Sequence, residues 1–298
     1  MIFTFYPIID IGSNTVKIAV FDTESPEVFT PVFFKSAHLR LISQRENGIL
    51  SDDAVDRLIN VINSFVSLAE LKGIDTPPYA FATASLRGLK NTRSVLSALK
   101  KYCGINAQIL SGAQEAYYSF KGVSATENTQ EGLMADLGGG STEFLSFSGG
   151  IPVRSHSFNF GFVKLAEKYY TLGPNAFADH VMRKLDSQDH VKNNRYPLYF
   201  IGGSAKAVCD VKKAFYGGQD TLTADELYKL HSSITQADEK TAELIKARVG
   251  ERAFGLEAAV IFFYCVVNKA NKKIAVVSRG GVREGYAGEL MKKNRDLI

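Results

Sequence analysis

The sequence predicts an α/β protein built from two similar domains. Its 298 residues are enough for two domains of roughly 150 residues each. Strand-like and helix-like segments alternate along the chain, which is typical of α/β folds. Asp10-Ile11-Gly12 also aligns with Asp136-Leu137-Gly138, 126 positions later, and a strand-like run follows each. Two halves that begin with the same strand, turn and strand indicate a duplicated domain.

The first half alternates between strands and helices. Residues 8–21 have the pattern strand, polar turn, strand, and 32–34 form a further short strand. A helix is predicted over 52–72, because Ser51, Asp52 and Asp53 suit its start, apolar residues recur at helical spacing, and Gly73 suits its end. The remaining elements are a strand running into a loop at 79–87, a helix at 92–101, a strand at 107–110 and a helix from 111.

A polar stretch, "SATENTQEG" at 124–132, separates the halves. We therefore expect domain I over 1–124 and domain II over 125–298, leaving open that the helix from about 284 packs back on domain I. Thr223 and Glu226 have the spacing of a capping box. Domain II is predicted to contain a hairpin at 134–147, a strand pair ending near 157, a helix at 163–170, a strand, glycine turn and helix at 196–208, a helix from 223, a buried helix at 254–268, and a last strand and glycine turn at 273–285.

The composition excludes several classes of protein. Hydrophobic residues make up 45% of the chain and charged residues 22%, and the net charge is +4, which suits an anionic substrate but is too weak to indicate a nucleic-acid partner. Cys103, Cys209 and Cys265 form no C-x-x-C pair, so we expect no disulfide framework and no zinc site. The longest apolar run, 258–267, is too short to span a bilayer. We expect a cytoplasmic protein without a membrane partner.

The stretch "DLGGGSTE" at 136–143 is the clearest chemical signal. Three glycines exceed the needs of a tight hairpin, and glycine lets a ligand approach the backbone closely. Bare N–H groups with the hydroxyls of Ser141 and Thr142 would form a cradle for phosphate oxygens. Asp136 and Glu143, on either side, could hold a metal or position a water. The alternative is a flexible turn with a carboxylate on each side.

Five segments in order along the chain resemble one family. They are "DIGSNT" (10–15), "ATASLR" (82–87), "SGAQEA" (111–116), "DLGGGSTE" (136–143) and "SRGGVREG" (278–285). Together they resemble the exopolyphosphatase / guanosine pentaphosphate phosphohydrolase family, within the sugar kinase–actin–heat-shock chaperone superfamily. The resemblance implies two actin-like (ribonuclease H-like) α/β domains around a central cleft. It also implies hydrolysis of the terminal phosphoanhydride of inorganic polyphosphate with Mg²⁺, releasing orthophosphate.

The resemblance also assigns roles to residues. Glu115 matches the catalytic glutamate, Asp136 and Glu143 match the acidic pair of the glycine hairpin, and Arg87 matches an arginine near the phosphates. Asp10 joins Asp136 and Glu143 as a metal ligand. The residues expected to bind phosphate are Ser13, Asn14, Gly138, Gly139, Gly140, Ser141, Thr142, Gly202, Gly203 and Ser204.

The chain departs from the family pattern at three positions. Gln114 replaces a second glutamate beside the proposed base, and Lys17 and Lys164 stand where arginine is common, which loses bidentate geometry. These changes leave the substrate open. The first alternative is a guanosine pentaphosphate 5′-phosphatase. An ATP-dependent kinase or ATPase, or an inactive sensor on the same fold, is a further alternative, and a homodimer is one candidate for the oligomeric state.

Overall fold

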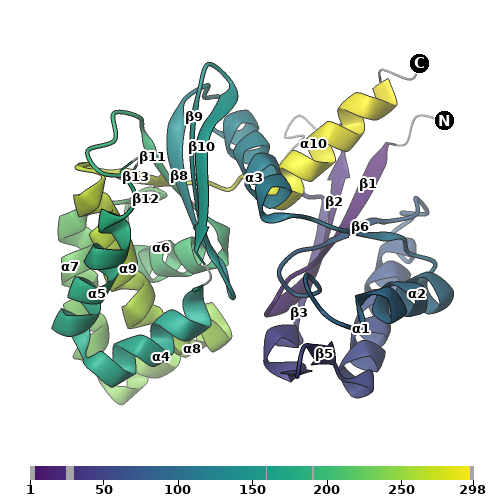
Figure 1. The fold of residues 1–298 in the computed structure, drawn as a ribbon, viewed down its shortest axis with the longest axis horizontal. Coiled ribbons are helices and arrows are strands. Elements are labelled where there is room, and N and C mark those ends of the chain that lie inside the picture. Colours follow the sequence, from purple (N-terminus) through teal and green to yellow (C-terminus); the bar gives the residue numbers. More distant parts are fainter. Residues whose placement is uncertain (1–3, 25–29, 159, 190, 296–298) are drawn as a thin grey trace. The chain divides into compact units, whose positions relative to one another are not determined.

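The computed structural model describes residues 4–24, 30–158, 160–189 and 191–295. The chain divides into two compact units, which are described separately. Unit 1 comprises Met1–Ala125 with Val282–Ile298, and unit 2 comprises Thr126–Gly281. The C-terminal helix α10 (Val282–Arg295) therefore belongs to unit 1, although it follows unit 2 in sequence (Figure 1).

Unit 1 contains a mixed sheet in the strand order β3-β2-β1-β6-β7. The first three strands along the chain are antiparallel neighbours, whereas β6 runs parallel to β1 and β7 runs parallel to β6. The elements are β1 (Phe5–Ile11), β2 (Thr15–Asp22), β3 (Phe33–His38), η1 (Leu41–Gln44), β4 (Arg45–Glu46), β5 (Ile49–Leu50), α1 (Asp52–Glu70), β6 (Tyr79–Ala82), α2 (Thr92–Cys103), β7 (Ala107–Ile109) and α3 (Gly112–Thr126).

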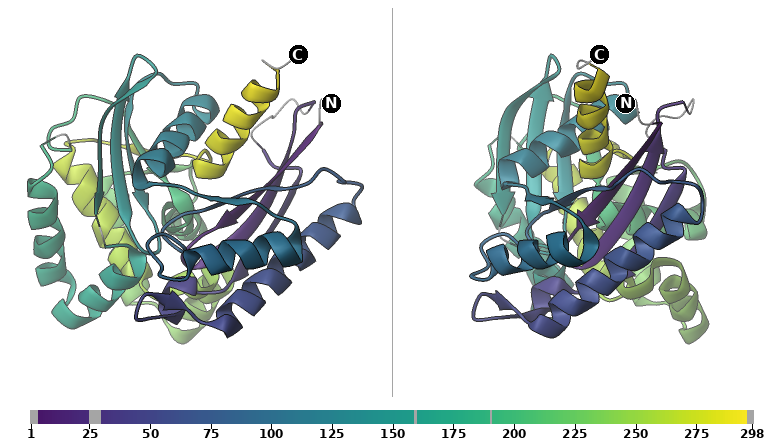
Figure 2. Two further views of the ribbon diagram at one scale, coloured as in Figure 1. Left: turned by 45° about the vertical axis from the view of Figure 1, so that its right-hand side comes forward. Right: turned by 90° about the vertical axis from the view of Figure 1, so that its right-hand side faces the viewer.

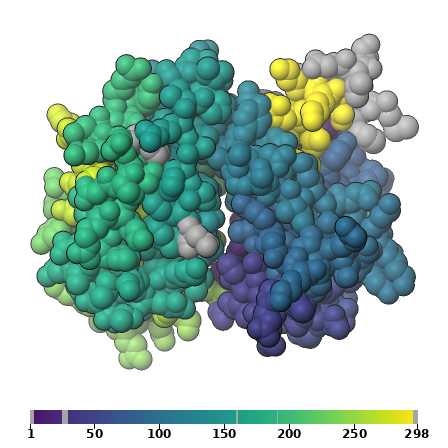
Figure 3. Space-filling view, viewed as in Figure 1, coloured from purple at the N-terminus to yellow at the C-terminus, as the bar shows by residue number. Residues whose placement is uncertain are grey.

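Helices cover both faces of this sheet (Figure 2). Successive strand residues alternate between two cores, as the pleat of a strand requires. Ile9 and Ile18 belong to the core shared with α1 and α2, whereas Ile8 and Phe81 belong to the core shared with α10. α10 adjoins α3, and Lys121 of α3 lies 3.9 Å from Glu289 of α10 (Figure 3).

Unit 2 repeats the arrangement, with the order β10-β9-β8-β11-β13-β12. Again the first three strands are antiparallel and the next two, β11 and β13, run parallel to the first. The elements are β8 (Gly132–Leu137), β9 (Thr142–Ser148), β10 (Ile151–Phe158), α4 (Phe162–Leu172), α5 (Pro174–Asp186), β11 (Leu198–Ile201), α6 (Gly202–Tyr216), β12 (Thr221–Leu222), α7 (Ala224–Thr235), α8 (Glu239–Val249), η2 (Gly250–Ala253), α9 (Leu256–Lys269) and β13 (Ala275–Val277).

Helix α9 forms the centre of the core of unit 2. It carries buried residues on all sides and packs against α4, α5, α6 and α7 (Figure 1). The prediction of a buried helix at 254–268 is thus confirmed, with its start two residues later because Gly255 has a left-handed conformation at the N-cap. In the described part of the chain, no helix combines the length and apolar character needed to cross a bilayer.

Several predicted boundaries differ from the structure. α1 ends at Glu70, although Gly73 has the left-handed φ of +77° expected near a helix end. The strand predicted at 32–34 is β3, which begins at Phe33 and continues to His38 along β2. The capping box of Thr223 and Glu226 is confirmed by hydrogen bonds in both directions.

Candidate active site

The turn between β1 and β2 carries the first predicted phosphate-binding residues. The Gly12 N–H donates to Thr15 O at 3.1 Å, and a Cβ at Gly12 would lie only 2.8 Å from that oxygen. The carbonyl of Ser13 accepts from Ile42 N, and that of Asn14 accepts from Arg40 N. The turn is therefore fixed to the segment that follows β3.

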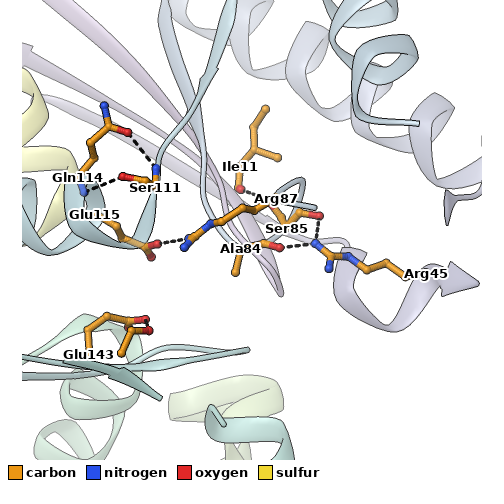
Figure 4. Close-up of polar contacts among 10 residues, drawn as sticks. Ile11, Arg45, Ala84, Ser85, Arg87, Ser111, Gln114, Glu115 and Glu143 are labelled. Carbon is orange, nitrogen blue, oxygen red and sulfur yellow. Dashed lines mark hydrogen bonds and ion pairs between the residues drawn. The ribbon is translucent and has the colours of Figure 1, made fainter. Parts of the chain in front are cut away.

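The motif at 82–87 is held in place by a second arginine. The Arg45 guanidinium donates to the carbonyls of Ala84 and Ser85, and the Ser85 hydroxyl donates to Ile11 O (Figure 4). Burial lowers the pKa of Arg45, and the positive charge of Arg87 lowers it further. These contacts link the loop after β6 to the end of β1.

Arg87 meets Glu115, the predicted catalytic glutamate. Arg87 Nη2 donates to Glu115 Oε2 at 2.6 Å (Figure 4), and the side chain of Arg87 is 34% exposed and that of Glu115 14%. Glu115 lies in the first turn of α3, where Gly112 leaves room for the guanidinium, since a Cβ there would lie 3.2 Å from Arg87 Nη1. The structure thus brings the predicted base and the predicted arginine together within unit 1.

Gln114 has a structural role at the start of the same helix. The side-chain oxygen of Gln114 accepts from the backbone N–H of Ser111 at 2.9 Å, and the backbone N–H of Gln114 donates to Ser111 Oγ at 3.2 Å. This reciprocal pair is a capping box, which glutamine forms as well as glutamate does. The departure at Gln114 therefore preserves the start of α3.

The glycine hairpin of unit 2 joins β8 to β9. Asp136 and Glu143 are direct cross-strand neighbours in this hairpin. Glu143 is only 4% exposed, and its Oε1 accepts from the Ser157 hydroxyl at 2.9 Å. The carbonyls of Gly138 and Gly139 accept from the first N–H groups of α4. Any phosphate contact at the turn would therefore come from its N–H groups.

Close packing explains the glycines next to Asp136. Gly202 has φ +82°, and a Cβ there would overlap Asp136 Oδ1. A Cβ at Gly203 would overlap the guanidinium of Arg252, a residue of η2. Burial lowers the pKa of Arg252, against the opposing effect of Glu251 and Asp136. Arg252 thus lies beside the candidate site in unit 2, and no sequence motif indicated it.

Two predicted phosphate-binding hydroxyls are used within the protein. Thr142 Oγ1 donates to Phe160 O, and Ser204 Oγ donates to Leu137 O, each at 2.8 Å. Because both hydroxyls donate within the protein, the prediction that these two residues bind phosphate now concerns their backbone N–H groups. Of the other predicted residues, unit 1 holds Asp10, Ser13, Asn14, Arg87 and Glu115, and unit 2 holds Asp136, Gly138, Gly139, Gly140, Ser141, Glu143, Gly202 and Gly203.

Comparison with known proteins identifies the family. The sequence matches the Ppx/GppA phosphatase family over residues 19–294. The chain belongs to this family. Exopolyphosphatase 1 of Mycobacterium tuberculosis is 34% identical over 142 residues, which are 47% of this chain and 41% of that protein. The homologue from Mycobacterium leprae is 32% identical over 139 residues, 46% of this chain and 41% of that protein. The match spans about two fifths of the length of these relatives.

Solved structures of Ppx/GppA proteins share the fold. The Aquifex aeolicus family member superposes with a TM-score of 0.81 at 22% identity, over 98% of this chain and 99% of that one. An exopolyphosphatase from Cytophaga hutchinsonii gives a TM-score of 0.83 at 18% identity, over 97% of this chain and 98% of that one. These matches confirm the predicted fold class, an α/β protein with two actin-like domains. The family resemblance drawn from the motifs is also confirmed.

Proposed function

We propose that this chain is an exopolyphosphatase, which hydrolyses the terminal phosphoanhydride of inorganic polyphosphate and releases orthophosphate. The contact between Arg87 and Glu115 carries the proposal, because it joins two distant family motifs into one partly buried acid–arginine pair. The name of the mycobacterial relatives, exopolyphosphatase 1, supports the choice of substrate.

Glu115 would orient and deprotonate the attacking water. Phosphoryl transfer requires mainly positioning and stabilisation of charge, and a fixed carboxylate provides the first of these. Arg87 holds one carboxylate oxygen of Glu115 through Nη2. As a planar guanidinium with several donors, it can also bind oxygens of the transferred phosphoryl group.

Asp136 and Glu143 are suited to hold Mg²⁺. They are cross-strand neighbours, so their carboxylates belong to one face of the hairpin. Proteins usually hold Mg²⁺ through one or two carboxylates, with water and substrate phosphates completing the octahedron. When bound, Mg²⁺ would offset the negative charge of the phosphates. The arrangement we propose is therefore a site with two protein carboxylates, Asp136 and Glu143.

A panel of substrates tests the proposal. Phosphate release should be measured with tripolyphosphate, longer polyphosphates, guanosine pentaphosphate, ATP and a simple phosphate monoester. We expect turnover of polyphosphate with Mg²⁺ and none after chelation. Preference for guanosine pentaphosphate would favour the alternative function, and turnover of ATP alone would contradict both.

Light scattering on the same sample would test whether the chain forms a homodimer.

A further inference from the structure

The duplicated hairpins have the same geometry but differ in charge at one position. In unit 1, Asp10 lies opposite Lys17 across β1 and β2. In unit 2, Asp136 lies opposite Glu143 across β8 and β9. In the internal repeat, Asp10 corresponds to Asp136 and Lys17 corresponds to Glu143. The second member of the pair is thus a cation in one unit and a carboxylate in the other.

Asp10 is held between two cations. Lys17 Nζ lies 3.7 Å from Asp10 Oδ2, and Arg283 Nε lies 4.0 Å from the same oxygen. The side chains of Asp10, Lys17 and Arg283 are only 13%, 23% and 15% exposed, so water screens the interaction weakly. The Arg283 guanidinium also lies 5.2 Å above the ring of Phe34, and its Nη2 lies 3.7 Å from Oε1 of the buried Glu284. Both cations therefore lie beside Asp10, two residues before Gly12 of the proposed phosphate turn.

The corresponding cross-strand pair in unit 2 has two negative charges in place of one charge of each sign. Asp136 and Glu143 supply two carboxylates, and Arg252 is a cation that acts on Asp136. A divalent ion needs carboxylate oxygens and is repelled by fixed cations. The hairpin of unit 2 therefore favours a metal, and the hairpin of unit 1 favours an anion.

We propose that Asp10 is a positioning residue for Lys17 and Arg283, which bind phosphate at the turn of unit 1, and that Asp10 is not a metal ligand. The part of this proposal that concerns phosphate rests on the proposed function, whereas the part that concerns the metal does not. It replaces the expectation from sequence that Asp10 joins Asp136 and Glu143 at the metal.

The first experiment measures metal binding without substrate. Binding of Mn²⁺ to the full chain should be followed by electron paramagnetic resonance, with Asp10→Asn and Asp136→Asn as a matched pair from the two hairpins. We expect Asp136→Asn to weaken Mn²⁺ binding by at least about ten-fold. Asp10→Asn should leave the affinity within about two-fold of wild type, because no ligand is lost. Equal weakening by both variants would overturn the proposal.

The second experiment measures anion binding under chelation, where turnover does not interfere. Tripolyphosphate should bind about ten-fold more weakly to Lys17→Gln and to Arg283→Gln, because each loses a charge-assisted contact. The effect of Arg283→Gln should shrink in the Asp10→Asn background, since an unpositioned arginine has less to lose. Unchanged affinity in both single variants, or full additivity with Asp10→Asn, would overturn the role of Asp10.

Two controls keep these outcomes distinct. Thermal melting of each variant shows whether it is folded, and Asp10→Glu replaces Asp10→Asn in the metal test if the latter does not fold. Arg283→Lys keeps the charge and should retain part of the tripolyphosphate affinity. A chain that shows the expected Mn²⁺ pattern but hydrolyses no member of the substrate panel would contradict the proposed function and leave the metal assignment in place.

Discussion

Glu115 is fixed by contacts of two kinds. Arg87 binds its carboxylate, and the capping box of Ser111 and Gln114 fixes the first turn of α3 from which it projects. Because Gln114 caps the helix as a glutamate would, the replacement removes a charge near Glu115 without changing the local backbone. The consequence of Gln114 should therefore lie in the electrostatic field at the base.

Replacement of Glu115 by glutamine tests its role. The variant keeps the shape of the side chain but cannot accept a proton from water, so phosphate release should fall by about 10²–10⁴-fold. Tripolyphosphate binding and the melting temperature should change little. Glu243→Gln, an exposed carboxylate on α8, is the matched control and should behave as wild type. Near-normal activity of Glu115→Gln would assign the base to another residue.

Sequence motifs indicated the side chains proposed to be reactive better than the residues that support them. Glu115, Asp136 and Glu143 lie within short local patterns, so they could be recognised without a structure. Arg252 has no such pattern, and its place beside Gly203 arises from a contact between distant segments. Thr142 and Ser204 matched a phosphate-binding pattern, yet their hydroxyls donate hydrogen bonds to backbone carbonyls, which only the fold reveals.

At the scale of elements, the glycine hairpin and α4 form one packed structure. A Cβ at Gly161 would lie 2.6 Å from Gly138 O and equally close to the backbone at Gly140 and Ser141. In the described chain, none of the three glycines at 138–140 has a positive φ. The glycine run therefore reflects close approach of backbone segments, and not a left-handed turn.

Gly139→Val should weaken phosphate binding with little loss of stability. Since Gly139 does not have a positive φ, the added side chain introduces no left-handed strain. Its bulk would occupy the space proposed for a phosphate oxygen, so tripolyphosphate affinity should fall by at least about ten-fold, the loss of a charge-assisted hydrogen bond. Calorimetric titration and thermal melting measure the two effects.

Gly149→Val provides the opposite control. Gly149 has φ +62° in the turn between β9 and β10, with nothing within 4 Å of its position for a Cβ. Valine there should cost about 1–2 kcal/mol of stability through left-handed strain. Its tripolyphosphate affinity should stay at the wild-type value. If Gly139→Val also retained that affinity, the phosphate cradle would have to lie elsewhere.

The contact between α4 and α7 should make stability depend on pH. Tyr169 Oη lies 2.9 Å from His231 Nε2. Burial raises the pKa of Tyr169 to about 12, so the phenol donates and His231 accepts as the neutral imidazole. Burial also lowers the pKa of His231, and Glu257 opposes this only in part. The folded state thus binds fewer protons at His231 than the unfolded state does.

The sign of the effect follows from linkage. Above the ordinary histidine pKa of about 6.5, His231 is neutral in both states and contributes no slope. As the pH falls below that value, the unfolded chain gains a proton first, so the free energy of unfolding decreases. We expect the melting temperature to fall between pH 7 and pH 5, and to fall less in His231→Gln. Equal pH slopes in the two proteins would show that His231 is not responsible.

Elements with a strong local pattern were predicted, and others were missed. α9 has a long apolar sequence and α1 has apolar residues at helical spacing, and both helices were predicted. The sequence analysis did not predict α5 or α8. α5 begins with Pro174 at its first position, a start signal that is also common in turns, and α8 buries only Ile245. Such a weak apolar face leaves little periodicity to detect.

At the scale of the whole chain, the duplication was predicted, whereas the return of α10 to the first domain was only left open as an alternative. The repeat lies in the hairpins that begin each half, where Asp-aliphatic-Gly marks a local turn. The placement of α10 depends on a contact between helices far apart in sequence. Tyr286 and Ala287 of α10 are buried in the same core as Tyr6 and Phe81 of unit 1. No local signal specifies that choice of partner.

Gly285→Val tests the placement of α10. A Cβ at Gly285 would overlap the carbonyl of Tyr118 and lie 2.8 Å from Gly122 N, so α10 and α3 approach with backbone in contact. Valine would force the helices apart, and such overpacking typically costs about 1–3 kcal/mol. The loss should be confined to unit 1, because unit 2 contains none of these contacts.

Hydrogen exchange resolves the two units where a single melting curve would not. Peptides from α3, α10 and β1 should lose protection in Gly285→Val, whereas peptides from α9 should keep it, since the units can open separately when their cores are distinct. Lys292→Ala, at an exposed position on α10, is the control and should leave both units protected. Equal loss of protection in α9 would mean that the chain opens as one cooperative body. Because Arg283 in the first turn of α10 lies beside Asp10, weaker packing of α10 should lower the tripolyphosphate affinity together with the protection of unit 1.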